Sequence, residues 1–119
     1  MQNKQAIPVA RHGDLTIWKV SDNSQFKMKL RKDNILAFGE VTGHKHQIAV
    51  KERVVWDGEN QTLEINGEKL QVSKAFTLTM PAEITHEEHK NVFLPAGDYI
   101  VTTERERNPF LQAIQQVKD

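Results

Sequence analysis

The amino-acid sequence predicts an all-β protein, a single small barrel or sandwich with a short helix at its C-terminal end. Apolar and polar residues alternate with a period of two over most of the chain, as they do in strands that bury one face. Turn-forming residues recur at intervals of roughly eight to twelve positions, which is typical of all-β domains. No internal repeat or linker interrupts this pattern, and 119 residues fit one domain over positions 1–119.

The turn residues divide the alternating segments into individual strands. The clearest hairpin is centred on Asn66-Gly67, because this dipeptide tolerates the positive φ angles of a two-residue type I′ turn. Further turns are predicted at Asp57-Gly58, at residues 95–98 and at His12-Gly13-Asp14, which precedes the first strand. We expect strands at residues 15–20, 26–30, 35–38, 44–50, 54–56, 62–65, 68–72, 75–80, 92–94 and 99–103.

The C-terminal end carries a helical pattern instead. Asn108 can cap a helix, Pro109 suits its first turn, and Phe110, Ile114 and Val117 fall on one face. This short helix is expected to cover one end of the barrel or sandwich.

Composition excludes several classes of protein. The chain has no cysteine, which rules out disulfides, thiolate zinc sites and iron–sulfur clusters. Its 16 basic and 16 acidic residues cancel, and the lysines of segment 27–32 alternate with apolar residues like the solvated face of a strand, so nucleic-acid binding is not expected. Residues 1–10 lack the apolar run of a signal peptide or membrane span, which predicts a soluble, cytoplasmic protein.

Two pairs of histidines are the candidate functional residues. His44 and His46 are two positions apart on a predicted strand, so both point to the face that Ile48 and Val50 continue toward the interior. His86 and His89 are three positions apart, a spacing that suits a helical turn or a bulge. Either pair alone also fits ordinary surface or hydrogen-bonded histidines.

Together the two pairs predict a metal site formed by His44, His46, His86 and His89. Imidazole nitrogen is a common ligand of divalent transition metals, of which zinc is the first expectation and iron or nickel the alternatives. Glu52 shares the parity of His44 and His46 and is an alternative ligand if the strand continues that far. Glu87 and Glu88 are candidates for outer partners of the imidazoles or for a general base. The fifth histidine, His12, is interpreted as a turn residue.

The histidine motifs resemble those of the cupin barrels. In that superfamily an HxH pair, a glutamate and one histidine of a second motif bind a transition metal inside a small β-barrel or β-roll. Here the matching residues are His44, His46, Glu52 and one of His86 and His89. Glu52 lies one residue beyond the usual spacing, and the second motif lacks its glycine, so the resemblance leaves open which later histidine is the ligand.

A second resemblance covers almost the whole chain. The runs Gly-Glu-x-Thr-Gly-His-x-His, His-Glu-Glu-His, Leu-Pro-x-Gly-x-Tyr and Arg-Glu are similar to those of small uncharacterised proteins of bacteriophages and bacterial accessory gene clusters. In this chain they occupy residues 39–46, 86–89, 94–99 and 105–106. The resemblance implies a common fold and site, and a location in the host cytoplasm for a phage-encoded protein. Arg107 stands where the family carries tyrosine.

Two classes of function follow. The first is a small metal-binding accessory protein, encoded by a phage or mobile element, whose ion is structural and whose partner is a host or virion protein. The second is a cupin-like metalloenzyme that acts on a small molecule. Four histidine ligands favour the first class, and three with an open coordination position favour the second. A homodimer is compatible with both.

Overall fold

The computed structural model describes residues 6–12, 15–38, 43–65, 68–87 and 89–103, and it confirms the all-β prediction. All strand pairs are antiparallel, and the strands form two sheets. The six-stranded sheet has the order β1-β2-β10-β7-β6-β3, and the four-stranded sheet has the order β4-β5-β8-β9. The predicted C-terminal helix lies outside the described residues.

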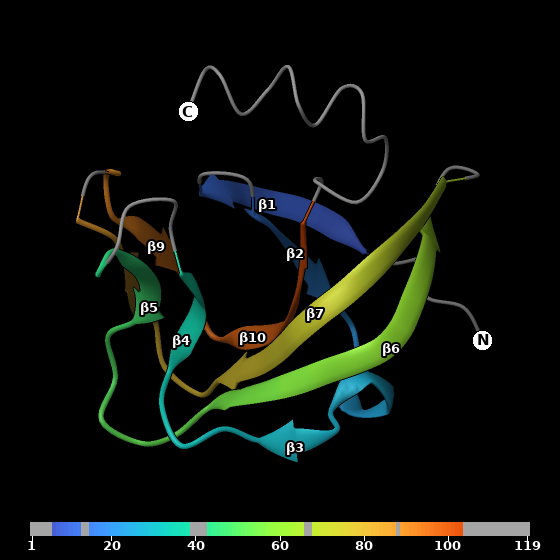
Figure 1. The fold of residues 1–119 in the computed structure, drawn as a ribbon, viewed down its shortest axis with the longest axis horizontal. Coiled ribbons are helices and arrows are strands. Elements are labelled where there is room, and N and C mark those ends of the chain that lie inside the picture. Colours follow the sequence, from blue (N-terminus) through green and yellow to red (C-terminus); the bar gives the residue numbers. More distant parts are fainter. Residues whose placement is uncertain (1–5, 13–14, 39–42, 66–67, 88, 104–119) are drawn as a thin grey trace.

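Figure 1 shows β4, β5 and β9 on one side of the molecule, facing the strands of the larger sheet. A single 3₁₀ turn, η1, precedes β3. The elements are β1 (Ile7–His12), β2 (Leu15–Val20), η1 (Ser24–Phe26), β3 (Lys29–Leu30), β4 (Ile35–Phe38), β5 (Lys45–Ile48), β6 (Val55–Ile65), β7 (Glu68–Leu78), β8 (Ala82–Thr85), β9 (Val92–Leu94) and β10 (Gly97–Thr103). No helix in this part of the chain is long and apolar enough to cross a membrane.

A long hairpin, β6–β7, replaces four of the predicted strands. The pair Ile65↔Glu68 places a two-residue connection at the predicted hairpin, although Asn66-Gly67 itself lies outside the described residues. The predicted turn at Asp57-Gly58 is wrong, because β6 continues through it with a shift of register between Asp57 and Gln61. A Cβ on Gly58 would stand 3.2 Å from the carbonyl oxygen of Phe26. Glycine at this position therefore allows η1 to approach the strand closely.

The predicted strand at residues 26–30 is also wrong in most of its length. Strand β3 is limited to Lys29 and Leu30, which pair with β6, and Phe26 is the last residue of η1. Phe26 is buried in a core cluster, whereas Met28 is about half exposed. The two apolar residues Phe26 and Met28 therefore do not share one buried face, because Phe26 lies in the core and Met28 is exposed to solvent.

Two strands were not predicted. Strand β1 exposes Ile7 and Val9 and buries His12 at its end, which is the reverse of the usual pattern. Strand β8 is short and follows Pro81, and it pairs with β5 on one side and β9 on the other. These two strands bring distant parts of the chain to β5.

Apolar side chains fill both faces of the six-stranded sheet. The main cluster lies between the two sheets and has Phe76 and Tyr99 stacked at its centre, with ring centroids 5.1 Å apart. A second cluster lies on the opposite face of the larger sheet. The main cluster contains Leu15, Ile17, Leu36, Ile48, Val55, Phe76, Leu78, Ala82, Ile84, Leu94, Tyr99 and Val101, and the second contains Val20, Phe26, Leu63, Val72, Ala75 and Ile100.

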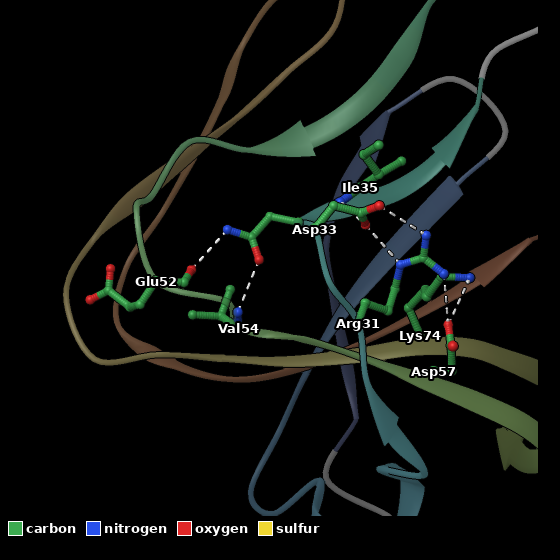
Figure 2. Close-up of polar contacts among 8 residues, drawn as sticks. Arg31, Asp33, Ile35, Glu52, Val54, Asp57 and Lys74 are labelled. Atoms are coloured by element: carbon green, nitrogen blue, oxygen red, sulfur yellow. Dashed lines mark hydrogen bonds and ion pairs between the residues drawn. The ribbon is translucent and has the colours of Figure 1, made fainter.

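Polar contacts hold the segment that leads from β5 of the smaller sheet to β6 of the larger sheet (Figure 2). The buried Asn34 side chain donates to the carbonyl oxygens of Val50 and Glu52 and accepts a hydrogen bond from the Val54 amide. Beside it, the Arg31 guanidinium pairs with Asp33 at 3.0 Å and with Asp57 at 3.1 Å. The Asn34 side chain thus satisfies three backbone groups of the segment that leads from β5 to β6.

Replacing Asn34 should destabilise the protein more than its size implies. In Asn34→Ala three backbone groups lose their partner, and each unsatisfied buried group costs about 1 kcal/mol or more, so we expect the free energy of unfolding to fall by about 2–4 kcal/mol. Urea denaturation measures this value. The matched control, Asn91→Ala at an exposed position, should change it by less than about 0.5 kcal/mol. Equal effects of the two substitutions would contradict this role of Asn34.

Candidate functional site

All five histidines of the chain gather at one end of the contact between the two sheets. His12 is the last residue of β1, in the six-stranded sheet. His46 lies in β5 and His44 just before it, and His86 and His89 lie in the connection from β8 to β9. In Figure 1 the end of β1 points to the upper left, the side on which β5 and β9 lie.

Four of the rings form a compact set, which we call the histidine cluster: His12, His46, His86 and His89. Every pair within it has ring centroids between 4.3 and 5.9 Å apart. The shortest separations are His46–His86 at 4.3 Å and His86–His89 at 4.5 Å. His44 contacts the cluster at His86, with ring centroids 5.6 Å apart.

Strand alternation explains why His46 points inward. His46 and Ile48 are buried, whereas Lys45 and Gln47, on the other face, are only half-buried. Strand β5 lies between β4 and β8, so its inner face has neighbours on both sides. His46 is only 3% exposed, and a side chain so deeply buried needs partners for its ring nitrogens.

The contacts of His12 define its tautomer. Its Nε2 lies 3.0 Å from the carbonyl oxygen of Lys90, and a carbonyl only accepts hydrogen bonds, so Nε2 carries the proton. In a neutral imidazole Nδ1 then holds a lone pair. That lone pair faces Nδ1 of His46 at 2.9 Å. At this distance the two atoms either share a proton donated by His46 or both face a cation.

The surroundings keep these imidazoles neutral. Burial, followed by repulsion from the neighbouring rings of His12, His86 and His89, lowers the pKa of His46 to about 3, and the Glu87 charge offsets only part of this decrease. Burial also lowers the pKa of His12, against the opposing effect of its bond to Lys90. Neutral imidazole is the form of histidine that binds metal ions.

A second set of ligand atoms lies at the outer side of the cluster. His44, His86 and Glu87, which we call the outer group, offer one ligand atom each, all within 4.8 Å of one another. The exposed Glu87 carboxylate accepts a hydrogen bond from the Lys45 amide at 2.9 Å, and this bond lowers the pKa of Glu87. Glu87 thus ties the β8–β9 connection to the start of β5.

The structure brings His44, His46, His86 and His89 to one place, together with one residue that the sequence analysis interpreted differently. His12 is a buried strand residue facing the other histidines. The clue available in the sequence was its parity with Ala10, which packs against the main core cluster. That clue was outweighed by Gly13-Asp14 directly after it.

Glu52 is not part of the site. Strand β5 ends at Ile48, so the parity argument stops there, and the exposed Glu52 presents its carbonyl oxygen to Asn34 instead (Figure 2). Glu88 lies outside the described residues. The glutamate beside the histidines in the described part of the chain is Glu87.

In protein kept free of metal, the free energy of unfolding should decrease from about pH 7 to about pH 5. The pKa of His46 is about 3 in the folded protein against an ordinary value of 6.5, so in this interval only the unfolded chain takes up the proton. For one such histidine the loss amounts to about 2 kcal/mol, and it continues as the pH falls toward the folded-state pKa.

Urea denaturation at the two pH values, with a chelator present, measures this dependence. His46→Gln should make the decrease smaller, because glutamine does not titrate. A wild-type protein equally stable at both pH values would contradict the neutral, buried state of His46.

A comparison with models of protein families gives a match for this chain. No curated protein and no solved structure matches the chain. The model of one family, described as a domain of unknown function (DUF8820), matches residues 11–104, a range that begins just before His12 and includes all the other histidines. The chain therefore belongs to the DUF8820 family of domains of unknown function.

Proposed function

We propose that the protein is a small metal-binding β-domain and that its histidines hold a divalent transition metal ion. The observation that carries the proposal is the meeting of five imidazoles from three separate segments at one partly buried place. These five are all the histidines of the chain.

A metal ion accounts for this arrangement better than packing does. Apolar side chains would fill the same space without the penalty of desolvating ring nitrogens, which is about 1–3 kcal/mol for each buried polar group left without a partner. The low pKa of His46 favours its neutral form, so protonation of this buried ring does not relieve the penalty. A cation that accepts several lone pairs at once removes the penalty.

The ligand chemistry favours zinc. With nitrogen ligands and no thiolate available, zinc binds readily in a tetrahedral shell. Iron and nickel also accept imidazole and are the alternatives.

The role that we propose for the ion is structural. It ties β5 to the β8–β9 connection, which is the short segment between Thr85 and Val92. The resemblance to phage and accessory-gene proteins extends this proposal to an accessory protein that binds a host or virion protein and acts in the host cytoplasm.

Removing the metal should lower the melting temperature. A ligand that binds only the folded state at about 100 times its Kd stabilises it by about 2.7 kcal/mol, which corresponds to roughly 10 °C for a chain of this size. Thermal denaturation of zinc-loaded protein with and without a strong chelator measures the difference. We expect the chelator to have no further effect on His46→Ala, because the site is already lost.

Gln47→Ala is the matched control for this experiment. Gln47 is the next residue of β5 and faces the opposite side of the sheet, so this variant should respond to the chelator as the wild type does. A melting curve of zinc-loaded wild type that the chelator leaves unchanged would contradict a structural role.

The outer group supports a second candidate function, a cupin-like metalloenzyme acting on a small molecule. Two imidazoles and one carboxylate form the kind of three-ligand set that catalytic zinc sites use, with a coordination position left open. Because Glu87 is exposed, a ligand set that includes it would leave this position accessible to solvent.

Cobalt substitution separates the two functions. An ion with four histidine ligands has no exchangeable position, so we expect the visible absorption of cobalt-loaded protein to be unchanged by azide. An azide-dependent spectral change that is abolished by Glu87→Gln would favour the enzyme instead. Glu83→Gln, which changes a carboxylate of β8 outside this group, serves as the control.

A further inference from the structure

We propose that His12, rather than His44, completes the four-histidine shell with His46, His86 and His89, so that the ion links the two β-sheets. This inference rests on the proposed metal-binding function and specifies its ligands. It differs from the set that the sequence motifs select, because His12 belongs to neither motif.

The first observation is the orientation of the His12 ring. Ligand histidines commonly donate their second N–H to a backbone carbonyl, which fixes the tautomer and aims the other nitrogen at the metal. His12 has this arrangement, since Nε2 donates to the carbonyl oxygen of Lys90 and Nδ1 faces into the cluster. The carbonyl that holds the ring belongs to the residue directly after His89.

The second observation is the distance between the two facing nitrogens. Two nitrogens that are each about 2.0–2.1 Å from one zinc ion lie roughly 2.8–3.4 Å apart at angles between about 90° and 110°. The Nδ1 atoms of His12 and His46 are 2.9 Å apart, within this range. A single ion can therefore contact both lone pairs without moving either ring far.

The third observation is the spacing of all four rings. When an imidazole binds through one nitrogen, its ring centre lies roughly 3.2 Å from the ion, so four rings around a tetrahedral ion have centres roughly 5 Å apart. The centroid distances within the histidine cluster range from 4.3 to 5.9 Å, so the rings have the spacing of such a shell. In the described part of the chain the ligand atoms that lie within 4.8 Å of one another are those of His44, His86 and Glu87, so the four rings must turn for their nitrogens to converge on one ion.

His44 lies at the margin of this arrangement. It precedes β5, next to Gly43 at φ 88°, and it contacts the cluster at His86 on the side where Glu87 is exposed. A tetrahedral ion takes four ligands, so five histidines cannot all bind it. We place His44 outside the shell because its ligand atom gathers with the exposed Glu87 carboxylate, which also holds the adjoining backbone through the Lys45 amide.

The consequence is a cross-link between sheets. His12 ends the edge strand of the six-stranded sheet, and the other three ligands come from β5 and the β8–β9 connection of the four-stranded sheet. Apolar contacts of the main core cluster already join the sheets. The ion adds a polar joint at the end where His12 and Lys90 meet.

Zinc affinity of two variants tests this assignment. In competition with a chromophoric chelator, His12→Gln should weaken zinc binding by more than about a hundredfold, since loss of a group that only hydrogen-bonds a ligand already costs about 10–100-fold. His44→Gln, the matched control, should change the affinity by less than about threefold. The reverse result would overturn the role of His12 and leave metal binding intact.

Nitrogen-15 NMR of wild-type imidazoles provides a reading that does not depend on the folding of a variant. Zinc should shift the Nδ1 resonances of His12 and His46 while Nε2 of His12 stays protonated, and the His44 resonances should move little. Shifts at His44 without shifts at His12 would overturn the inference. A wild type that binds no zinc in either experiment would instead remove the proposed function itself.

Discussion

The position of β10 between β2 and β7 determines where the other strands of the six-stranded sheet lie. Tyr99, Ile100, Val101 and Thr102 are all buried, so this strand has apolar contacts on both faces as well as hydrogen-bonded neighbours on both edges. The side chain of Asn23 fixes the same region by donating to the carbonyl oxygens of Phe76 and Tyr99. Strand β2 is thereby held, and β1, which pairs with β2, carries His12 to the second sheet.

Local patterns predicted those parts of the fold in which one face of a strand meets the core. Strands β2, β4 and β10 follow the alternation of their apolar residues, because each buries one face or both in the main cluster. The hairpin at Ile65 and Glu68 follows from the chemistry of its turn. These elements depend on neighbours in the sequence, which is why the sequence was sufficient.

The missed elements depend on neighbours that are distant in the sequence. Gly58 signals a turn locally, yet here its missing side chain admits η1 against β6. Strand β1 exposes its larger apolar residues, and its pairing shifts register between Pro8 and Ala10. The sequence motifs identified four histidines that the structure brings together. They did not identify His12, because its place at the site depends on contacts with His46 and Lys90, which are distant in the sequence.

The separation of the histidines along the chain has a kinetic consequence. His12 precedes His46 by 34 positions and precedes the carbonyl that it bonds by 78. Closing such long loops is entropically unfavourable until strands have paired, so we expect these imidazoles to meet late in folding. Interactions absent from the folding transition state slow unfolding and leave the folding rate almost unchanged. An ion bound there would prolong the lifetime of the native state without hastening its formation.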